Sequence, residues 1–408
     1  MKKLLASFFV LLTLTSCTTP PSTPPVNTST TPTPNIIFPT PPSCTDIVAA
    51  PTPGPDVPSV FPPVSTDDRV RGARNATLVL MDYSDYQDPR SALFAAVVDQ
   101  LLDENPNDIQ VVSRIFPLIA VNDKAALAAQ AAEAAAEQGK FWEVRALLYS
   151  QQANWGSLSG ADFEQWLSAQ ASALEMNVEQ FQSDLKRDDI VAKVQKAWED
   201  GQKMGLPGTP LILINGQIYG GPRDFSSLDN ILKLIQLGER QFESCPPVTV
   251  QETRQYIVTL HTEKGDIVMQ LFPNKAPITV NSFLFLARNG WYDNITFHRV
   301  LPGLFAQTGD PSGTGKGNPG YYVITEIDAS LKFDRPGVVA MVNSGPDTSG
   351  SQFFITYATT PDFDGQYTIF GQVISGMDVL GQLTARDAQP GTVIPPGDKL
   401  LSITIEEK

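Results

Sequence analysis

The sequence predicts a multidomain chain, in which an α/β domain with a helical insertion is followed by a mostly-β domain that forms a closed antiparallel barrel. Three observations lead to this fold class. The chain has 408 residues, which exceeds the usual size of one domain. Between 69 and 245, short apolar runs alternate with segments of helical periodicity. From 253 to 408, short alternating strands are separated by glycine-rich turns.

The composition is that of folded domains, and it limits the classes of function. Hydrophobic residues make up 42% of the chain and charged residues 18%, as in globular proteins. The formal net charge of −15 argues against a nucleic-acid partner, because phosphate binding requires a surplus of lysine and arginine. The chain has two histidines, His261 and His298, and three scattered cysteines. We therefore expect no metal site and no cofactor.

The first residues have the pattern of a secretion signal. Two lysines precede an apolar run over 4–14, which is too short to anchor a chain across a bilayer but suits the core of a signal peptide. The following Leu-Thr-Ser-Cys17 resembles the lipobox of bacterial lipoproteins. We expect a signal peptide at 1–16, lipidation of Cys17, and a membrane-anchored protein at the cell surface or in a periplasm. The alternative is an ordinary signal peptide with an incidental cysteine.

A proline- and threonine-rich spacer over 17–68 follows the signal peptide. Residues 18–65 hold 15 of the 34 prolines, and such a stretch is typical of a semi-extended spacer. Cys44 lies in this spacer and Cys245 at the end of the next region. Because cysteines left over in an oxidising compartment often pair, we expect a Cys44–Cys245 disulfide. The alternative is two free thiols.

The region 69–245 alternates between strand and helix patterns. Apolar runs predict strands at 76–81, 109–117 and 211–214. A helical pattern fills 124–201, Asn215-Gly216 is typical of a hairpin turn, and a last helix is expected near 226–240.

Three segments of this region are distinctive: the strand-to-helix turn at 83–91, Gln-Gly-Lys-Phe-Trp at 138–142, and Gly-Thr-Pro210. With these segments the region resembles the thioredoxin-like oxidoreductases of the DsbA type, which carry a cis-proline at the position of Pro210. The two redox cysteines of the family would fall on Asp88 and Ser91, which cannot perform thiol–disulfide exchange. Asp88 followed by proline fits a helix N-cap instead. The resemblance therefore implies a redox-inactive domain, whose groove beside Pro210 could hold an extended polypeptide or a second copy.

A linker over 246–252 leads to the region 253–408. Alternating residues predict strands at 256–260 and 266–272. Apolar residues on one helical face predict a helix over 277–289, and a final strand is expected at 400–405.

Five sequence motifs follow one another in this region. They are Phe-His-Arg-Val-Leu-Pro-Gly at 297–303, Gln-Thr-Gly-Asp-Pro at 307–311, Val-Val-Ala-Met-Val-Asn at 338–343, Gly-Ser-Gln-Phe-Phe-Ile at 350–355 and Asp-Gly-Gln-Tyr-Thr-Ile-Phe-Gly at 364–371. The region resembles the cyclophilins, because five motifs of that family stand here in the right order and spacing. The resemblance implies a peptidyl-prolyl cis–trans isomerase.

The resemblance also implies a set of site residues. Rotation about a prolyl bond faces a barrier of about 18–20 kcal/mol, and a donor aimed at the prolyl nitrogen would stabilise the twisted amide. The family gives this role to Arg299, with Gln307 orienting it and Phe354 flooring the proline pocket. The substrate-binding positions carried over are Leu304, Phe305, Val342, Asn343, Gln352, Phe363 and Tyr367. The family often has tryptophan at the position of Asp362, and we expect His298 to be structural.

The function expected from the sequence is an isomerase that assists the folding of exported proteins. Its partners would be proline-containing unfolded or extended polypeptides, and the membrane through the lipid anchor. The alternative is a non-catalytic module that binds proline-containing segments at the cell surface.

Overall fold

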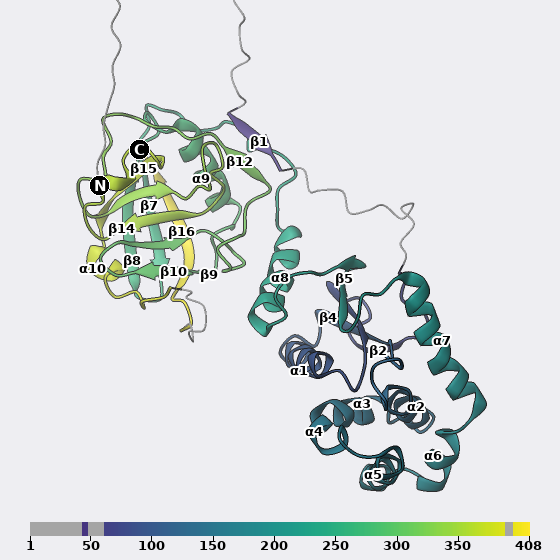
Figure 1. The fold of residues 1–408 in the computed structure, drawn as a ribbon. Helices are drawn as coiled ribbons and strands as arrows, with labels where there is room; N and C mark the ends of the chain where they lie inside the picture. Colours follow the sequence, from purple (N-terminus) through teal and green to yellow (C-terminus); the bar gives the residue numbers. More distant parts are fainter. Residues whose placement is uncertain (1–42, 48–60, 388–394) are drawn as a thin grey trace, which may run out of the picture. The chain divides into compact units, whose positions relative to one another are not determined.

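The computed structural model describes residues 43–47, 61–387 and 395–408. The expected signal peptide, the lipidated Cys17 and most of the spacer lie outside these residues. In the described part of the chain, none of the helices combines the length and the apolar character needed to cross a bilayer. The folded chain comprises a middle domain, from Phe61 to Gly238, and a C-terminal domain (Figure 1).

The middle domain is built on a five-stranded sheet with the strand order β2-β4-β3-β5-β6. The pair β3 and β4 is parallel, and the other pairs are antiparallel. Because parallel neighbours need a crossover, the helix α1 (Pro89–Glu104) connects β3 to β4. The strands are β2 (Arg69–Gly72), β3 (Leu78–Ser84), β4 (Ile109–Ile115), β5 (Leu211–Ile214) and β6 (Gln217–Ile218).

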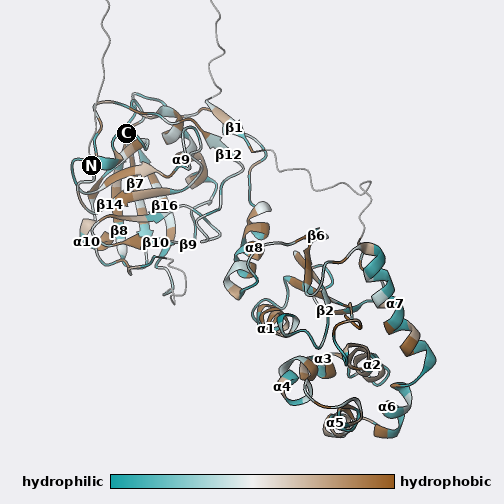
Figure 2. Ribbon diagram, viewed as in Figure 1, coloured by the Kyte–Doolittle hydropathy of each residue, from teal (hydrophilic) through white to brown (hydrophobic). Residues whose placement is uncertain are grey.

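The helices of this domain pack on the sheet and on one another. Helices α1 and α8 share a core with the strands, whereas the inserted helices between β4 and β5 form a second core around Trp155 and Phe163. Figure 2 shows a largely hydrophilic α7, of which three residues are buried. The helices are α1 (Pro89–Glu104), α2 (Ala125–Ala136), α3 (Phe141–Ser150), α4 (Gln152–Trp155), α5 (Gly160–Ala173), α6 (Val178–Asp184), α7 (Asp188–Met204) and α8 (Phe225–Gly238).

The turn between β5 and β6 follows from its two residues. Asn215 and Gly216 have φ values of 48° and 80°, a left-handed backbone that asparagine and glycine tolerate best. This turn brings β6 back against β5. The α/β architecture with a helical insertion, predicted from the sequence, is confirmed.

The C-terminal domain contains a nine-stranded antiparallel sheet, of which β8, β7 and β16 are long neighbours (Figure 1). Its helices are α9 (Pro277–Arg288) and α10 (Met377–Leu380), and a 3₁₀ turn spans Pro361–Phe363. The strands are β7 (Tyr256–Thr262), β8 (Gly265–Leu271), β9 (Ile295–Thr296), β10 (Arg299–Leu301), β11 (Phe305–Thr308), β13 (Val338–Met341), β14 (Phe353–Thr356), β15 (Ile369–Ser375) and β16 (Lys399–Glu407).

The predicted closure of this barrel is wrong. The strand order is β10-β11-β14-β13-β15-β8-β7-β16-β9, so that β10 and β9 are the two edges, and no ladder joins them within the described residues. The edge strand β10 bonds instead to an irregular stretch. The Val300 N–H donates to the Arg386 carbonyl at 2.6 Å, and the Arg386 N–H donates back at 2.9 Å. The sheet is therefore a curled, open half-barrel, whose edge strand β10 bonds to this stretch and not to β9.

Side chains of the sheet enter two separate hydrophobic clusters. Along β14, Phe353 and Ile355 belong to the large interior core, whereas Phe354 between them belongs to a smaller cluster. Alternation is expected because successive residues of a strand point to opposite faces. The smaller cluster, called here the outer aromatic cluster, is centred on Phe305, Phe333 and Phe354.

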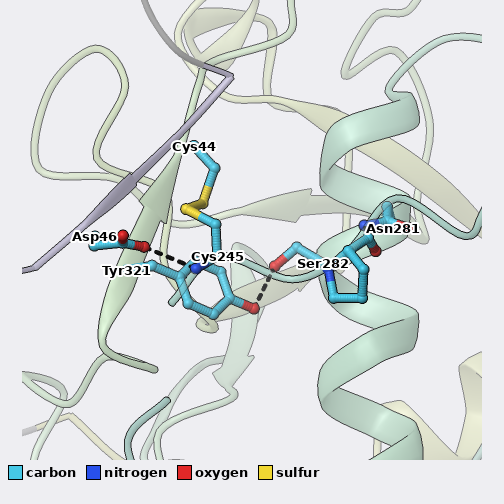
Figure 3. The surroundings of a disulfide bond; sticks show 7 residues. Cys44, Asp46, Cys245, Asn281, Ser282 and Tyr321 are labelled. Carbon is cyan, nitrogen blue, oxygen red and sulfur yellow. Dashed lines mark hydrogen bonds between the residues drawn. A yellow bond between two sulfur atoms is a disulfide. The ribbon is translucent and has the colours of Figure 1, made fainter. Parts of the chain in front are cut away.

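A short strand from the spacer joins the C-terminal domain. Strand β1 (Cys44–Asp46) pairs antiparallel with β12 (Tyr321–Val323), and Ile47 N–H donates to the Gly320 carbonyl at 2.8 Å. Cys44 forms a disulfide with Cys245, with an S–S distance of 2.06 Å. The Cys245 N–H donates to Asp46 Oδ1 at 2.7 Å (Figure 3). The ladder, the disulfide and this hydrogen bond together form what we call the clasp.

The chain after the middle domain also lies on the C-terminal domain. Phe242 N–H donates to the Pro319 carbonyl at 2.9 Å, and Asn281 Oδ1 accepts the N–H groups of Thr249 and Val250 at 2.8 and 3.2 Å. Part of the expected linker 246–252 is therefore held against α9 by the two hydrogen bonds to Asn281.

His298 lies in the corner between β9 and β10 and is only 8% exposed. Burial is the main reason that the pKa of this imidazole lies below its ordinary value. The nearby cations Arg386 and Arg299 lower the pKa further, and the Asp310 carboxylate raises it in part. The folded protein therefore keeps His298 neutral at a pH where the unfolded chain is protonated.

Replacing Cys44 and Cys245 by serine should destabilise the C-terminal domain by about 2–4 kcal/mol, because the disulfide restricts the unfolded chain. We expect faster hydrogen exchange at β1 and β12, measured by mass spectrometry on the full chain. The oxidised and reduced wild-type proteins provide the matched comparison. Equal protection of β12 with and without the disulfide would show that the clasp does not stabilise this edge.

The stability of the C-terminal domain should depend on pH through His298. Because the folded pKa is lowered, the unfolded state binds more protons below about pH 6.5, and stability falls as the pH drops through that value. His298→Gln should flatten this dependence in hydrogen exchange of residues 256–407 between pH 7.5 and 5. His261→Gln is the matched control, and an unchanged slope in His298→Gln contradicts the assignment.

Candidate active site

Strand register places three of the expected site residues in one row across the sheet. Arg299 on β10 is the cross-strand partner of Gln307 on β11, and Gln307 is the partner of Phe354 on β14. Directly paired residues of antiparallel strands point to the same face. The row therefore sets the guanidinium, the amide and the phenyl ring side by side on the face that carries the outer aromatic cluster.

Arg299 lies at the open end of this row. Its side chain is 45% exposed, and its Nε donates to Asp387 Oδ1 at 2.9 Å. The guanidinium carbon lies 5.3 Å from the centre of the Phe305 ring, within the range of a cation–π contact. A permanent positive charge is thus held over apolar surface while it stays accessible to solvent.

Aromatic rings surround Phe354 at short distances. The centre of its ring lies 5.5 Å from that of Phe305, 5.8 Å from Phe363 and 5.3 Å from Tyr367. Phe333 lies at 5.9 Å with the two planes only 10° apart. Rings from four separate segments therefore build an apolar surface next to Arg299.

Two aliphatic residues complete this surface. Leu304 and Val342 are partly buried and pack against the outer aromatic cluster. Leu304 follows the turn between β10 and β11, in which Gly303 has a φ of 82°, and its N–H donates to the Leu301 carbonyl at 2.9 Å. The turn thus positions the side chain beside Phe305.

Polar groups form a second set next to the aromatic rings. Gln307 Nε2 donates to Gln352 Oε1 at 2.9 Å, and Gln352 Nε2 donates to the Gly317 carbonyl at the same distance. Asn343 Nδ2 donates to the Gln366 carbonyl at 2.9 Å. Val342, Asn343 and Gln352 line a hollow of about 270 Å³ together with residues of the 315–318 loop.

The structure thus brings the expected residues of the C-terminal site together, and it adds two that the sequence did not indicate. Phe333 stands between two charged residues in a loop, and Asp387 follows an irregular stretch. Neither position belongs to a repeating pattern. The expectation that Gln307 orients Arg299 stays a prediction, since the Gln307 amide donates to Gln352 and the Arg299 Nε to Asp387.

In the middle domain, Asp88 and Ser91 stand where the family has its two redox cysteines, and their side chains are hydrogen-bonded to each other. Asp88, only 5% exposed, caps α1: its Oδ1 accepts the Arg90 N–H at 3.1 Å. Its Oδ2 accepts the hydroxyls of Ser91 at 3.2 Å and Thr209 at 2.7 Å. The Thr209–Pro210 peptide bond is cis. Asp88, Ser91 and the Pro210 turn therefore lie together, joined by bonds among themselves.

Among the described residues, no group of three or more histidine, cysteine, aspartate or glutamate side chains is arranged to hold a metal ion.

Two family models match separate parts of the chain. A model described as "Thioredoxin" matches residues 65–234, which is the middle domain. A model described as "Cyclophilin type peptidyl-prolyl cis-trans isomerase/CLD" matches residues 257–405, which is the C-terminal domain. The thioredoxin-like and cyclophilin-like domains predicted from the sequence are confirmed.

Curated relatives match the C-terminal domain. Peptidyl-prolyl cis-trans isomerase-like 3 of Rhizopus delemar is 51% identical over 130 residues, which are 30% of this chain and 76% of the relative. Peptidyl-prolyl cis-trans isomerase CYP18-1 of Arabidopsis thaliana is 47% identical over 148 residues, which are 36% of this chain and 89% of the relative. A solved cyclophilin of Cryptosporidium parvum is 35% identical, with 38% of this chain and 98% of that structure covered and a TM-score of 0.34.

The five motifs, the family match over 257–405 and relatives covered over most of their length agree on the same domain. The chain therefore belongs to the cyclophilin-type peptidyl-prolyl cis–trans isomerases, and its C-terminal domain is an enzyme of this class.

Proposed function

We propose that Arg299 catalyses prolyl isomerisation by donating a hydrogen bond to the prolyl nitrogen of a half-rotated peptide. The observation that supports this most is the accessible guanidinium held 5.3 Å over the Phe305 ring, in one row with Gln307 and Phe354. A proline ring against Phe354 would bring its nitrogen toward this cation.

The chemistry requires no proton transfer and no covalent intermediate. Conjugation between the prolyl nitrogen and the carbonyl creates the barrier, and rotation gives the nitrogen a free lone pair. A donor placed at this lone pair interacts with the twisted state more strongly than with either planar isomer, which is the condition for catalysis. A preorganised donor of this kind is worth about 2.7–4 kcal/mol of barrier, which is roughly 100- to 1,000-fold in rate.

The remaining site residues would bind the peptide. Phe354, Phe305, Phe363 and Tyr367 offer apolar surface to the proline ring. Asn343 and Gln352 line the adjoining hollow, where their amides would bond to the extended backbone of the residues beside the proline. Tyr367 would add a hydroxyl group to this otherwise apolar surface.

We place the protein outside the cytoplasm, as a lipid-anchored isomerase that acts on exported proteins. The Cys44–Cys245 disulfide supports an oxidising compartment, and the pattern up to Cys17 supports secretion and lipidation. Mass spectrometry of the mature N-terminus tests the lipid on Cys17.

The middle domain would hold clients and perform no redox chemistry. Asp88 and Ser91 are hydrogen-bonded to one another, and Asp88 also to Thr209, and neither side chain is a thiolate nucleophile. The alternative for the whole protein is a module that binds proline-containing segments without turning them over, and the Arg299 variant below separates the two.

Arg299→Ala should lower kcat/KM for cis–trans isomerisation of a proline peptide by about 100-fold, because one preorganised donor is lost. The measurement uses the full chain and a spectrophotometric or NMR exchange assay. Arg288→Ala is the matched control, since Arg288 lies on α9 and pairs with Glu407. Equal rates for wild type and Arg299→Ala would support the non-catalytic binding module.

Asp88→Ala should destabilise the middle domain by about 1–2 kcal/mol, because the α1 cap and the bond to Thr209 are lost. Asp88→Asn keeps an acceptor oxygen and should lose less. Hydrogen exchange of α1 reports the stability, and the isomerase rate should stay unchanged. A drop in isomerase rate with intact α1 protection would argue against a purely structural Asp88.

A further inference from the structure

We infer that Asp387 is a positioning residue for the isomerase reaction, which fixes the guanidinium of Arg299 at the angle needed for catalysis. The inference rests on the proposed role of Arg299 and adds a residue to it. No cyclophilin motif found in the sequence includes this position, and its contact with Arg299 is visible only in the folded chain.

The backbone brings Asp387 opposite Arg299. Val300 and Arg386 form an isolated antiparallel bridge, in which each N–H donates to the other carbonyl, at 2.6 and 2.9 Å. In an antiparallel arrangement, the residues next to such a doubly bonded pair face each other with their side chains on one side. Arg299 precedes Val300 and Asp387 follows Arg386, so the bridge sets these two side chains next to each other.

The bridge is itself anchored by the side chain of Arg386. Its Nε donates to the His298 carbonyl at 3.1 Å, and its Nη1 donates to the Pro395 carbonyl. Arg386 therefore ties the irregular stretch both to the residue before Arg299 and to the chain leading into β16. The backbone next to Asp387 is therefore held both by the bridge to Val300 and by the side chain of Arg386.

The contact fixes the guanidinium without using its end. The bond runs from Arg299 Nε to Asp387 Oδ1 at 2.9 Å, so the terminal Nη1 and Nη2 groups take no part in it. Phe305 supports the guanidinium from a different residue, with the carbon 5.3 Å from the ring centre. A carboxylate at Nε and a ring beneath the plane together restrict both the position and the rotation of the group.

The exposure of the Arg299–Asp387 pair limits what it contributes to stability. The side chains of Arg299 and Asp387 are 45% and 27% exposed, and ion pairs this open contribute little to folding. A long, exposed arginine has many rotamers, and restricting them before the peptide binds removes an entropic cost from the reaction. The expected effect therefore falls on kcat, while peptide affinity changes little.

Asp387→Ala should lower kcat roughly fivefold with KM nearly unchanged, since the donor remains but is no longer held. Asp387→Asn keeps an oxygen that accepts from Nε and should restore most of kcat. The matched control is Asp189→Ala, which removes a similar Nε–carboxylate contact to Arg187 in the middle domain. All variants are compared as full chains, with hydrogen exchange of β10 and β11 as the test of intact folding.

A second comparison measures the coupling between the two residues. In an Arg299→Lys background there is no Nε group to hold, so Asp387→Ala should change kcat less than it does with Arg299 present. If Asp387 instead weakens the cation by neutralising it, both Asp387→Ala and Asp387→Asn will raise kcat, which overturns the inference.

Different results would contradict the catalytic role of Arg299 and the positioning role of Asp387. An Arg299→Ala variant with wild-type activity removes the proposed function and the inference together. A large loss in Arg299→Ala combined with a wild-type kcat in Asp387→Ala overturns only the role of Asp387. An equal effect of Asp387→Ala in the wild-type and Arg299→Lys backgrounds, or a loss confined to KM, contradicts it as well.

Discussion

The proposed isomerase site depends on the register of three antiparallel strands. Because β10 pairs with β11 and β11 with β14, Arg299, Gln307 and Phe354 fall in one row on one face. A slip of one residue in either pairing would turn a side chain of this row toward the interior core. The alternation along β14 makes this register costly to change, since Phe353 and Ile355 fill that core while Phe354 does not.

The sequence predicted those parts of the structure that follow from local pattern. Alternating residues located the strands around Val258 and Met269, and Asn215-Gly216 located a hairpin. The motifs named Arg299 and Phe354 as expected site residues, and the strand register sets both in one row with Gln307. Contacts between distant, irregular segments left no such pattern. The predicted closed barrel was wrong because β10 pairs with Arg386 in an irregular stretch, and no ladder joins it to β9 among the described residues. Asp387 and Phe333 were missed for the same reason. Each contacts a residue that is distant in sequence, and their sequence neighbours form no pattern that indicates these contacts.

The clasp joins the spacer to the C-terminal domain by a strand ladder and a disulfide. Cys44 and Cys245 are 201 positions apart, and the chain between them contains the middle domain. Both of these cysteines pack against the interior core of the C-terminal domain. The middle domain thus lies, along the chain, between two residues that are covalently joined on the C-terminal domain. Asp88 keeps the start of α1 ordered in a domain without a thiol pair at that position.

A structure of the full chain bound to a short proline-containing peptide tests the role of Arg299 most directly. We predict a proline ring against Phe354, with a terminal guanidinium nitrogen of Arg299 within hydrogen-bond distance of the prolyl nitrogen and Nε still bonded to Asp387. A peptide bound elsewhere, or a prolyl nitrogen turned away from Arg299, would contradict this role.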